Sequence, residues 1–308
     1  MKRARIAGDQ LRAGTRFAMR LERTLRVPDD GRSYPLPPSF GAFPLYRTRD
    51  YPAMRAAASR GEFFVPVYQW EALWLSFEAA EWKPNAVQVA AGGVNVLSGE
   101  AFPARLGSRP QNYLVCPLQP WLDGIRTAAG TVRQFVAAPP GAGLTLEEQI
   151  AGTCGRGGLQ VRVYEPRPGV FPARRPRGFA SALLCESVFA DAGMGLAGGG
   201  AIEQKVYPDP HGRKVWDPAN YCDIGVLLVN SAEFRAITGQ DPPPSPVAAE
   251  DYERLGLPWF RLYDEDLADS APAAKLRGLR TVPGGPKSVG AKNVKGIRRG
   301  SRSAGKRS

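Results

Sequence analysis

The sequence predicts a β-rich α+β fold: an antiparallel sheet or sandwich with a few short helices and a disordered C-terminal tail. Three observations support this class. Several short segments alternate apolar and polar residues with the period of two that is typical of strands. The 308 residues include 29 prolines and 35 glycines, which favour turns over long helices. After residue 269 hydrophobicity falls, and Gly, Ser, Lys and Arg dominate the sequence.

The chain length allows one large domain or two modest ones, because single cores stop growing near roughly 250–300 residues. We predict an N-terminal arm over residues 1–12, a single β-rich globular domain over 13–270 and a disordered basic tail over 271–308. A subdivision of the globular domain near residues 165–180 stays open.

The clearest strand covers residues 15–27, where Phe17, Met19 and Leu21 share one face and charged residues share the other. Arg23 interrupts the apolar face, so we expect it at a sheet rim or a bulge. Residues 63–77 are dense in large apolar groups, and we interpret them as a strand followed by a short helix. Further strands are predicted over 113–116, 131–137, 159–164 and 222–229.

Residues 86–98 predict a β-hairpin around Gly92-Gly93, because Gly-Gly supplies the positive φ of a two-residue turn. The register then places Ala91 opposite Val94 and keeps the apolar side chains on one face.

Three short helices are expected from capping signals. Thr145 has capping-box spacing to Glu148 and opens a helix that ends near Gly152. Residues 230–231 can cap a helix closed by Gly239, and residues 245–256 form another. The Gly-x-Gly-x-x-Gly pattern at 193–198 lacks a following helix start, so we interpret it as a flexible surface loop rather than a dinucleotide site.

The formal net charge of +12 belongs almost entirely to the C-terminal end. Residues 275–308 hold eleven basic residues and no acid, whereas the preceding 274 residues are nearly neutral. Such a segment attracts nucleic acid or another polyanion through counterion release. An incidental, solubilising tail is the alternative. The tail residues expected to contact nucleic acid are Lys292, Lys295, Arg298, Arg299, Arg302, Lys306 and Arg307.

Composition limits which metal, cofactor and membrane roles the sequence predicts. Cys116, Cys154, Cys185 and Cys222 form no Cys-x-x-Cys pair, so we predict reduced thiols and neither a metal site nor a cofactor. No secretory signal is readable, and no apolar run approaches the roughly 20 residues of a membrane span. We therefore expect a soluble cytoplasmic protein with no membrane partner.

The candidate site residues gather between positions 207 and 223. Carboxylates beside aromatic rings are typical of sugar-cleaving or sugar-binding sites. The structural alternative is that loop aspartates cap turns, aromatic residues fill the core and the single histidine lies in an exposed turn. The catalytic candidates are Asp209, His211, Asp217 and Asp223, and the ligand-binding candidates are Tyr207, Trp216 and Tyr221.

Five segments carry a resemblance to a known family. They are Val-Tyr-Gln-Trp-Glu at 67–71, Gln-Pro-Trp-Leu-Asp-Gly at 119–124, Gly-Leu-Gln-Val at 158–161, Arg-Ala-Ile-Thr-Gly at 235–239 and Gly-Leu-Pro-Trp-Phe at 256–260. The stretch from about 63 to 265 resembles a family of conserved but uncharacterised bacterial proteins. That family has no established activity, so the resemblance implies a coherent fold and assigns no site.

These observations favour a non-enzymatic binding or structural module whose basic tail contacts an acidic partner such as nucleic acid. The sequence has one histidine, no metal-ligand spacing and no nucleophile elbow. The alternative is a carbohydrate-active hydrolase or a glycan-binding protein that uses the carboxylates and aromatics around 207–223.

Overall fold

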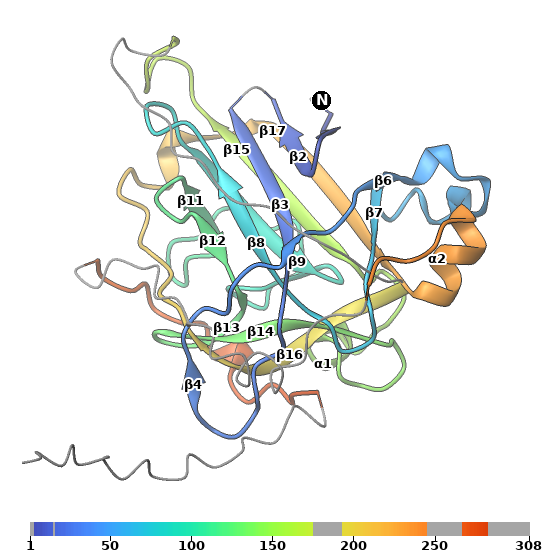
Figure 1. Ribbon diagram of the computed structural model, residues 1–308. Coiled ribbons are helices and arrows are strands. Elements are labelled where there is room, and N and C mark those ends of the chain that lie inside the picture. The colour runs from blue at the N-terminus through green and yellow to red at the C-terminus, as the bar shows by residue number, and fades with distance from the viewer. Residues whose placement is uncertain (1–2, 15, 175–192, 245–266, 283–308) are drawn as a thin grey trace, which may run out of the picture.

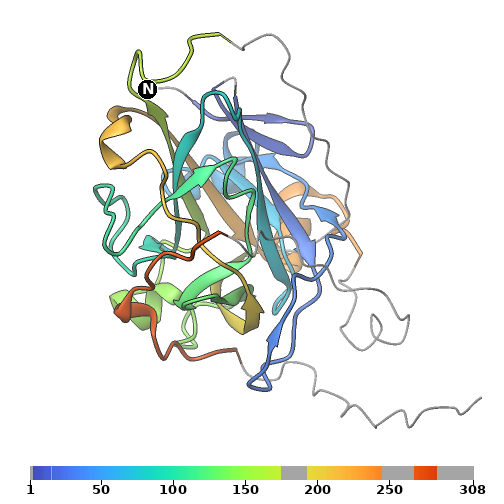
Figure 2. The ribbon, with the colours of Figure 1, turned by 90° about the vertical axis from the view of Figure 1, so that its left-hand side faces the viewer.

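The computed structural model describes residues 3–14, 16–174, 193–244 and 267–282. Strands account for 42 % of the structure and helices for 11 %, which confirms the predicted β-rich class. The strands form two packed sheets that share β16 (Gly193–Glu203) (Figures 1 and 2). The pairings are antiparallel except for β16 with β4 and β17 with β7.

The first sheet contains β1 (Arg5–Ala7), β2 (Gln10–Ala13), β3 (Phe17–Thr24), β4 (Ser33–Tyr34), β5 (Gly41–Ala42), β8 (Ala72–Glu78), β12 (Trp121–Leu122), β13 (Gly124–Ala128) and β14 (Thr131–Ala138). The second contains β6 (Tyr46–Arg47), β7 (Phe63–Pro66), β9 (Asn85–Ala91), β10 (Val94–Asn95), β11 (Leu114–Cys116), β15 (Leu159–Pro166) and β17 (Trp216–Val229). The helices are α1 (Leu146–Ala151) and α2 (Ser231–Thr238), with short 3₁₀ turns η1 (Thr48–Asp50), η2 (Pro52–Ala57), η3 (Arg213–Val215) and η4 (Ala274–Leu276).

The main core lies between the two sheets. Leu21 and Leu75 face it from the first sheet, and Val89, Val161 and Ile224 face it from the second. In the second sheet β15 is central, because it pairs with β9 on one side and with β17 on the other. The burial of these aliphatic side chains is the main favourable term in the stability of the fold.

Local signals were the most reliable predictors of the elements. The hairpin register is confirmed: Ala91 faces Val94 across the Gly92-Gly93 turn. The Thr145 capping box is present, and α1 ends at Gly152 with φ of 66°. α2 likewise ends at Gly239, as predicted. The helix expected over 245–256 lies outside the described residues.

The short helix predicted within 63–77 is wrong, because residues 72–78 form strand β8. Leu73, Leu75 and Phe77 alternate toward the core, and β8 pairs with β3 along its whole length. The spacing of Trp70 and Trp74 resembled a helix face, but Trp70 adopts a left-handed conformation with φ of 70° before the strand begins. Tertiary pairing therefore overrides a local pattern that fitted either structure.

Arg23 lies neither at a rim nor at a bulge. It is buried on β3, and its guanidinium forms an ion pair with the buried Glu71 at 2.6 Å. The other face of β3 is also covered, because the buried Glu22 accepts a hydrogen bond from Ser76 Oγ at 2.7 Å. A buried arginine is tolerated here because a carboxylate compensates its charge.

The glycine-rich segment 193–198 belongs to β16 and is not a surface loop. The glycines of β16 permit close strand packing: a Cβ on Gly195 would lie 2.8 Å from Thr145 Cγ2, and one on Gly199 would lie 2.6 Å from Val136 Cγ2. Glycine at these positions therefore reflects a crowded interior, where the absence of a side chain is required.

The ends of the domain also differ from the prediction. Residues 5–13 form a hairpin on β3, with Leu11 buried opposite Met19, rather than an arm. Residues 267–282, which we name the C-terminal strap, pack on the body and bury Leu276 and Val282. The predicted tail boundary at 271 is therefore too early, because two widely spaced apolar residues give no local signal. The strands before and after the region 165–180 in sequence, β15 and β16, both pair with β17.

Candidate functional site

The predicted site residues follow one another from the end of β16 through η3 into β17. Asp209 lies at their centre, and its Oδ2 accepts hydrogen bonds from the Tyr113 hydroxyl at 2.5 Å and from Trp216 Nε1 at 2.9 Å. Its Oδ1 accepts the backbone N–H of His211 at 2.8 Å. Burial, together with the neighbouring Asp209 carboxylate, raises the pKa of the Tyr113 hydroxyl. Asp209 therefore fixes this loop against the core.

Asp223 is held by a different partner, Arg162 on the neighbouring strand. Arg162 Nε and Nη2 donate to the two carboxylate oxygens of Asp223 at 2.6 and 2.7 Å. The guanidinium also lies 3.8 Å from the centre of the Tyr221 ring, which is a cation–π distance. Burial by itself would lower the pKa of Arg162. The hydrogen bonds and the charge of Asp223 outweigh burial, so the pKa of Arg162 lies above its usual value. Arg162 is thus a fixed cation.

The remaining candidates have local or packing contacts. Asp217 lies near the start of β17, and its Oδ1 accepts the backbone N–H of Ala219 at 3.0 Å. The exposed His211 ring meets Phe171 edge-on at 5.1 Å. Tyr207 and Trp216 are buried, with 4 % and 1 % of their surface exposed. Their ring faces therefore contact protein, as in the structural alternative considered from the sequence.

A surface pocket of about 420 Å³ opens beside these residues. Three segments form its walls: the loop 103–106, the end of β15 and the segment from η3 into β17. Apolar groups at the pocket include Leu106, Tyr164 and Trp216. Five of the eleven lining residues are cationic, and none is acidic: Arg105, Arg162, Arg167, Arg213 and Lys214. We name this feature the basic pocket.

Most of the positive charge of the basic pocket is uncompensated. Arg162 is paired with Asp223. Within the described part of the chain, no ion pair joins Arg105, Arg167, Arg213 or Lys214 to a carboxylate, and all four are exposed. Cations gathered around a concave surface raise the local concentration of anions.

Backbone contacts hold the walls of the pocket together. The backbone N–H of Arg167 donates to Val215 O at 2.8 Å, and Arg167 Nε donates to Lys214 O at 3.0 Å. The loop wall is fixed by Asn112, whose Nδ2 donates to Arg105 O at 2.9 Å. The pocket is therefore formed by the fold and does not depend on a ligand for its shape.

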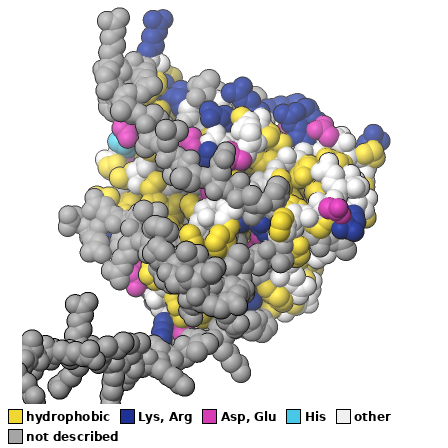
Figure 3. Space-filling model, in the orientation of Figure 1, with side chains coloured by type: hydrophobic (Ala, Val, Ile, Leu, Met, Phe, Trp, Pro, Cys, Tyr) yellow, Lys and Arg dark blue, Asp and Glu magenta, His cyan; other side chains and the backbone are white. Residues whose placement is uncertain are grey.

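Sequence reasoning missed the five cations because they are spread over more than 100 positions in a body of nearly neutral charge. One signal was present: Arg162 follows the alternation of residues 159–164, which points it away from the core. Basic side chains also cover the upper margin of the face in Figure 3, so charge alone does not single out the pocket. The pocket is distinguished by its concave shape together with cations that have no carboxylate partner among the described residues.

Comparisons of the chain with protein-family models, with curated proteins and with solved structures give no match. Among the described residues, no group of three or more His, Cys, Asp or Glu side chains could hold a metal ion. In the same part of the chain, no helix is long and apolar enough to cross a membrane. The tail residues from Lys292 to Arg307 and Cys185 lie outside the described residues.

Proposed function

We propose that this chain is a binding module for anionic ligands, with the basic pocket as the site on its body. The observation that carries the proposal is a 420 Å³ pocket with five cations in its lining, four of which have no carboxylate partner in the described structure. By contrast, Arg23 and Arg126, the most buried arginines among the described residues, each form an ion pair with a carboxylate. A concentration of uncompensated charge is unfavourable for the free protein and is relieved when an anion binds.

The residue types suit this role. Four of the five cations are arginines, whose planar guanidinium can donate two parallel hydrogen bonds to a phosphate or carboxylate. Arg162 contributes positive charge at a fixed position, because Asp223 and Tyr221 hold it. The hydrolase alternative gains less support, because Asp209 and Asp223 already have partners inside the protein.

The C-terminal tail is the second part of the proposal. Eight Lys and Arg residues and no acid follow Val282, the last described residue. The strap that ends at Val282 lies at the opposite end of the body from the loop after β15 and η3 (Figures 1 and 2). Truncation after Val282 and substitution of a pocket arginine therefore test the two contributions separately.

Fluorescence anisotropy with a labelled single-stranded oligonucleotide of about 20 nucleotides tests the proposal across about 50 to 200 mM salt. The proteins are the full chain, a chain that ends at Val282, and full-length Arg213→Gln. Full-length Arg55→Gln is the matched control, because it removes one exposed charge on η2, outside the pocket. Ending the chain at Ser270 would be unsuitable, since it removes the buried Leu276.

We expect truncation at Val282 to flatten the dependence of affinity on salt, because each phosphate neutralised by the tail contributes about 0.7 to the logarithmic slope. We expect Arg213→Gln to weaken binding several-fold more than Arg55→Gln does. Equal affinities for Arg213→Gln, Arg55→Gln and the unmodified chain would remove the pocket from the proposal. An unchanged salt slope after truncation would remove the tail.

A further inference from the structure

The dimensions of the basic pocket limit what it can hold. Its volume of about 420 Å³ falls in the range of roughly 300–1,000 Å³ that is typical of small-molecule sites. Three separate chain segments wall it, and Arg167 and Lys214 join two of them by a hydrogen bond. A surface pocket of this size suits a compact ligand.

The lining has two kinds of surface. Arg105, Arg167, Arg213 and Lys214 supply exposed positive charge. Arg162 is paired with Asp223. The remaining lining residues are apolar or aromatic: Pro103, Ala104, Leu106, Tyr164, Trp216 and Pro218, of which Tyr164 and Trp216 are almost fully buried. A ligand that uses both surfaces has a strongly anionic group and an organic body with apolar faces. Inorganic phosphate satisfies only the first requirement, and a neutral nucleoside satisfies only the second.

The number of cations indicates the charge of the anionic group. A single carboxylate supplies one negative charge, whereas four exposed cations without carboxylate partners surround this pocket. A phosphate ester or diphosphate has between about 1.5 and 3 negative charges near neutral pH and several acceptor oxygens. Two oxygens of one phosphate group can also accept the two parallel N–H bonds that an arginine guanidinium donates.

We infer that the basic pocket binds a small organic phosphate, of the size and chemistry of a nucleoside diphosphate. This inference rests on the proposed anion-binding function and names its ligand class. The phosphate group is bound by the four exposed cations. The organic body lies against the lining residues that are exposed or half-buried and apolar: Pro103, Ala104, Leu106 and Pro218. Because Arg162 and the backbone of Arg167 are already fixed, binding has to order the four exposed cationic side chains but not the walls behind them.

Isothermal titration calorimetry of the full chain tests the inference with ADP, adenosine and inorganic phosphate as probes. We expect ADP to bind at least about tenfold more tightly than inorganic phosphate, and adenosine to bind at least about tenfold more weakly than ADP. Arg105→Gln and Arg213→Gln should each lower ADP affinity about tenfold, while Arg55→Gln should leave it within about twofold. These side chains are exposed, so thermal unfolding of the variants should match that of the unmodified chain.

The outcomes separate this inference from the proposed function. If ADP does not bind but oligonucleotide affinity still depends on Arg213, the small-phosphate inference is wrong and the anion-binding function stands. If ADP binds no more tightly than inorganic phosphate, the apolar lining has no role and the ligand class is wrong. If neither ADP affinity nor oligonucleotide affinity changes in Arg105→Gln or Arg213→Gln, both proposals fail.

Discussion

The strap end and the pocket end of the molecule use arginine in opposite ways. At the strap end, Arg126 has 2 % of its surface exposed and is bound by Asp269 at 2.8 Å and by Ser270. At the pocket end, Arg105 and Arg213 are exposed and have no carboxylate partner among the described residues. Arginines at the strap end thus hold the fold together, whereas those at the pocket end leave their positive charge at the surface.

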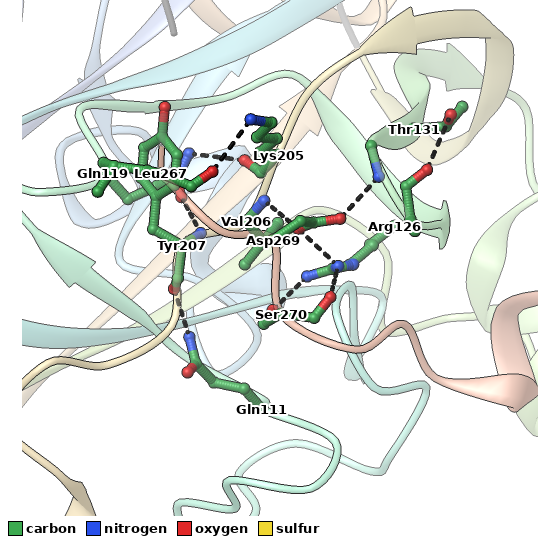
Figure 4. Close-up of polar contacts among 12 residues, drawn as sticks. Gln111, Gln119, Arg126, Thr131, Lys205, Val206, Tyr207, Leu267, Asp269 and Ser270 are labelled. Carbon is green, nitrogen blue, oxygen red and sulfur yellow. Dashed lines mark hydrogen bonds and ion pairs between the residues drawn. The ribbon is translucent and has the colours of Figure 1, made fainter. Parts of the chain in front are cut away.

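Figure 4 shows the polar contacts that compensate charge at the strap end. The Asp269 carboxylate accepts hydrogen bonds from Arg126, from Gly130 N at 2.7 Å and from Val206 N at 2.8 Å. Lys205 Nζ donates to the backbone oxygen of Leu267 at 3.0 Å. One carboxylate on the strap thus binds a buried cation and two backbone N–H groups, one in the turn between β13 and β14 and one after β16.

The largest effect is expected from Asp269→Ala. This substitution leaves the Arg126 guanidinium buried without its carboxylate, and a broken buried pair costs about 3–5 kcal/mol. Urea denaturation measures the free energy of unfolding, with Arg213→Gln as the exposed comparison, expected within about 0.5 kcal/mol of the unmodified chain. A loss below about 1 kcal/mol for Asp269→Ala would erase the distinction between the two ends.

A second prediction concerns Asp123, a fully buried carboxyl group without a cationic partner. Trp121 Nε1 donates to its Oδ2 at 3.0 Å, while Oδ1 has no hydrogen-bond partner in the described structure. Burial raises the pKa of Asp123 to about 8, above the value of about 3.9 in an unfolded chain. The folded state therefore retains this proton in a pH range where the unfolded state has lost it.

The sign of the pH effect follows from that difference. The contribution of Asp123 to stability is fully present below about pH 4 and is lost as the pH rises through about 8. Asp123→Asn removes the titration and keeps an acceptor for Trp121, so at pH 8 it should stabilise the fold by on the order of 2 kcal/mol. Thermal unfolding between about pH 5 and 8 provides the measurement. A constant difference between variant and unmodified chain across that range would contradict the prediction.

The smallest effect is expected from Asp223→Asn, which converts Arg162 from a compensated to an uncompensated cation. The Asp223 side chain is 35 % exposed, so loss of the ion pair should cost only about 1 kcal/mol of stability. ADP affinity, measured by calorimetry, should rise about threefold, because a negative charge beside the pocket is removed. A fall in affinity would mean that Asp223 supports ligand binding directly, as the alternative interpretation of this carboxylate requires.

The predictable parts of the fold depended on residues close together in sequence. The Gly92-Gly93 turn and the Thr145 capping box each contain their own geometric requirement, and both were located correctly. Arg23 could not be placed from sequence, because its environment depends on Glu71, a residue 48 positions away. The glycines of β16 were misread for the same reason: the side chains that crowd them belong to other segments.

The candidate site also depends on residues that are far apart in the sequence. The sequence drew attention to Trp216, Tyr221 and Asp223, and the structure places Trp216 at the pocket and Asp223 on its Arg162. The cations themselves come from three segments, and each is ordinary in its local context. Only the packing of the loop 103–106 against β15 and η3 makes them one surface.

Strand β16 also has a consequence for how the molecule unfolds. β16 pairs with β14 in the first sheet and with β17 in the second. The two sheets therefore cannot separate unless one of these pairings is broken. The two sheets should therefore melt in one cooperative transition. Through this shared strand, a substitution at the strap end that lowers global stability also lowers the fraction of molecules in which the pocket at the other end is formed.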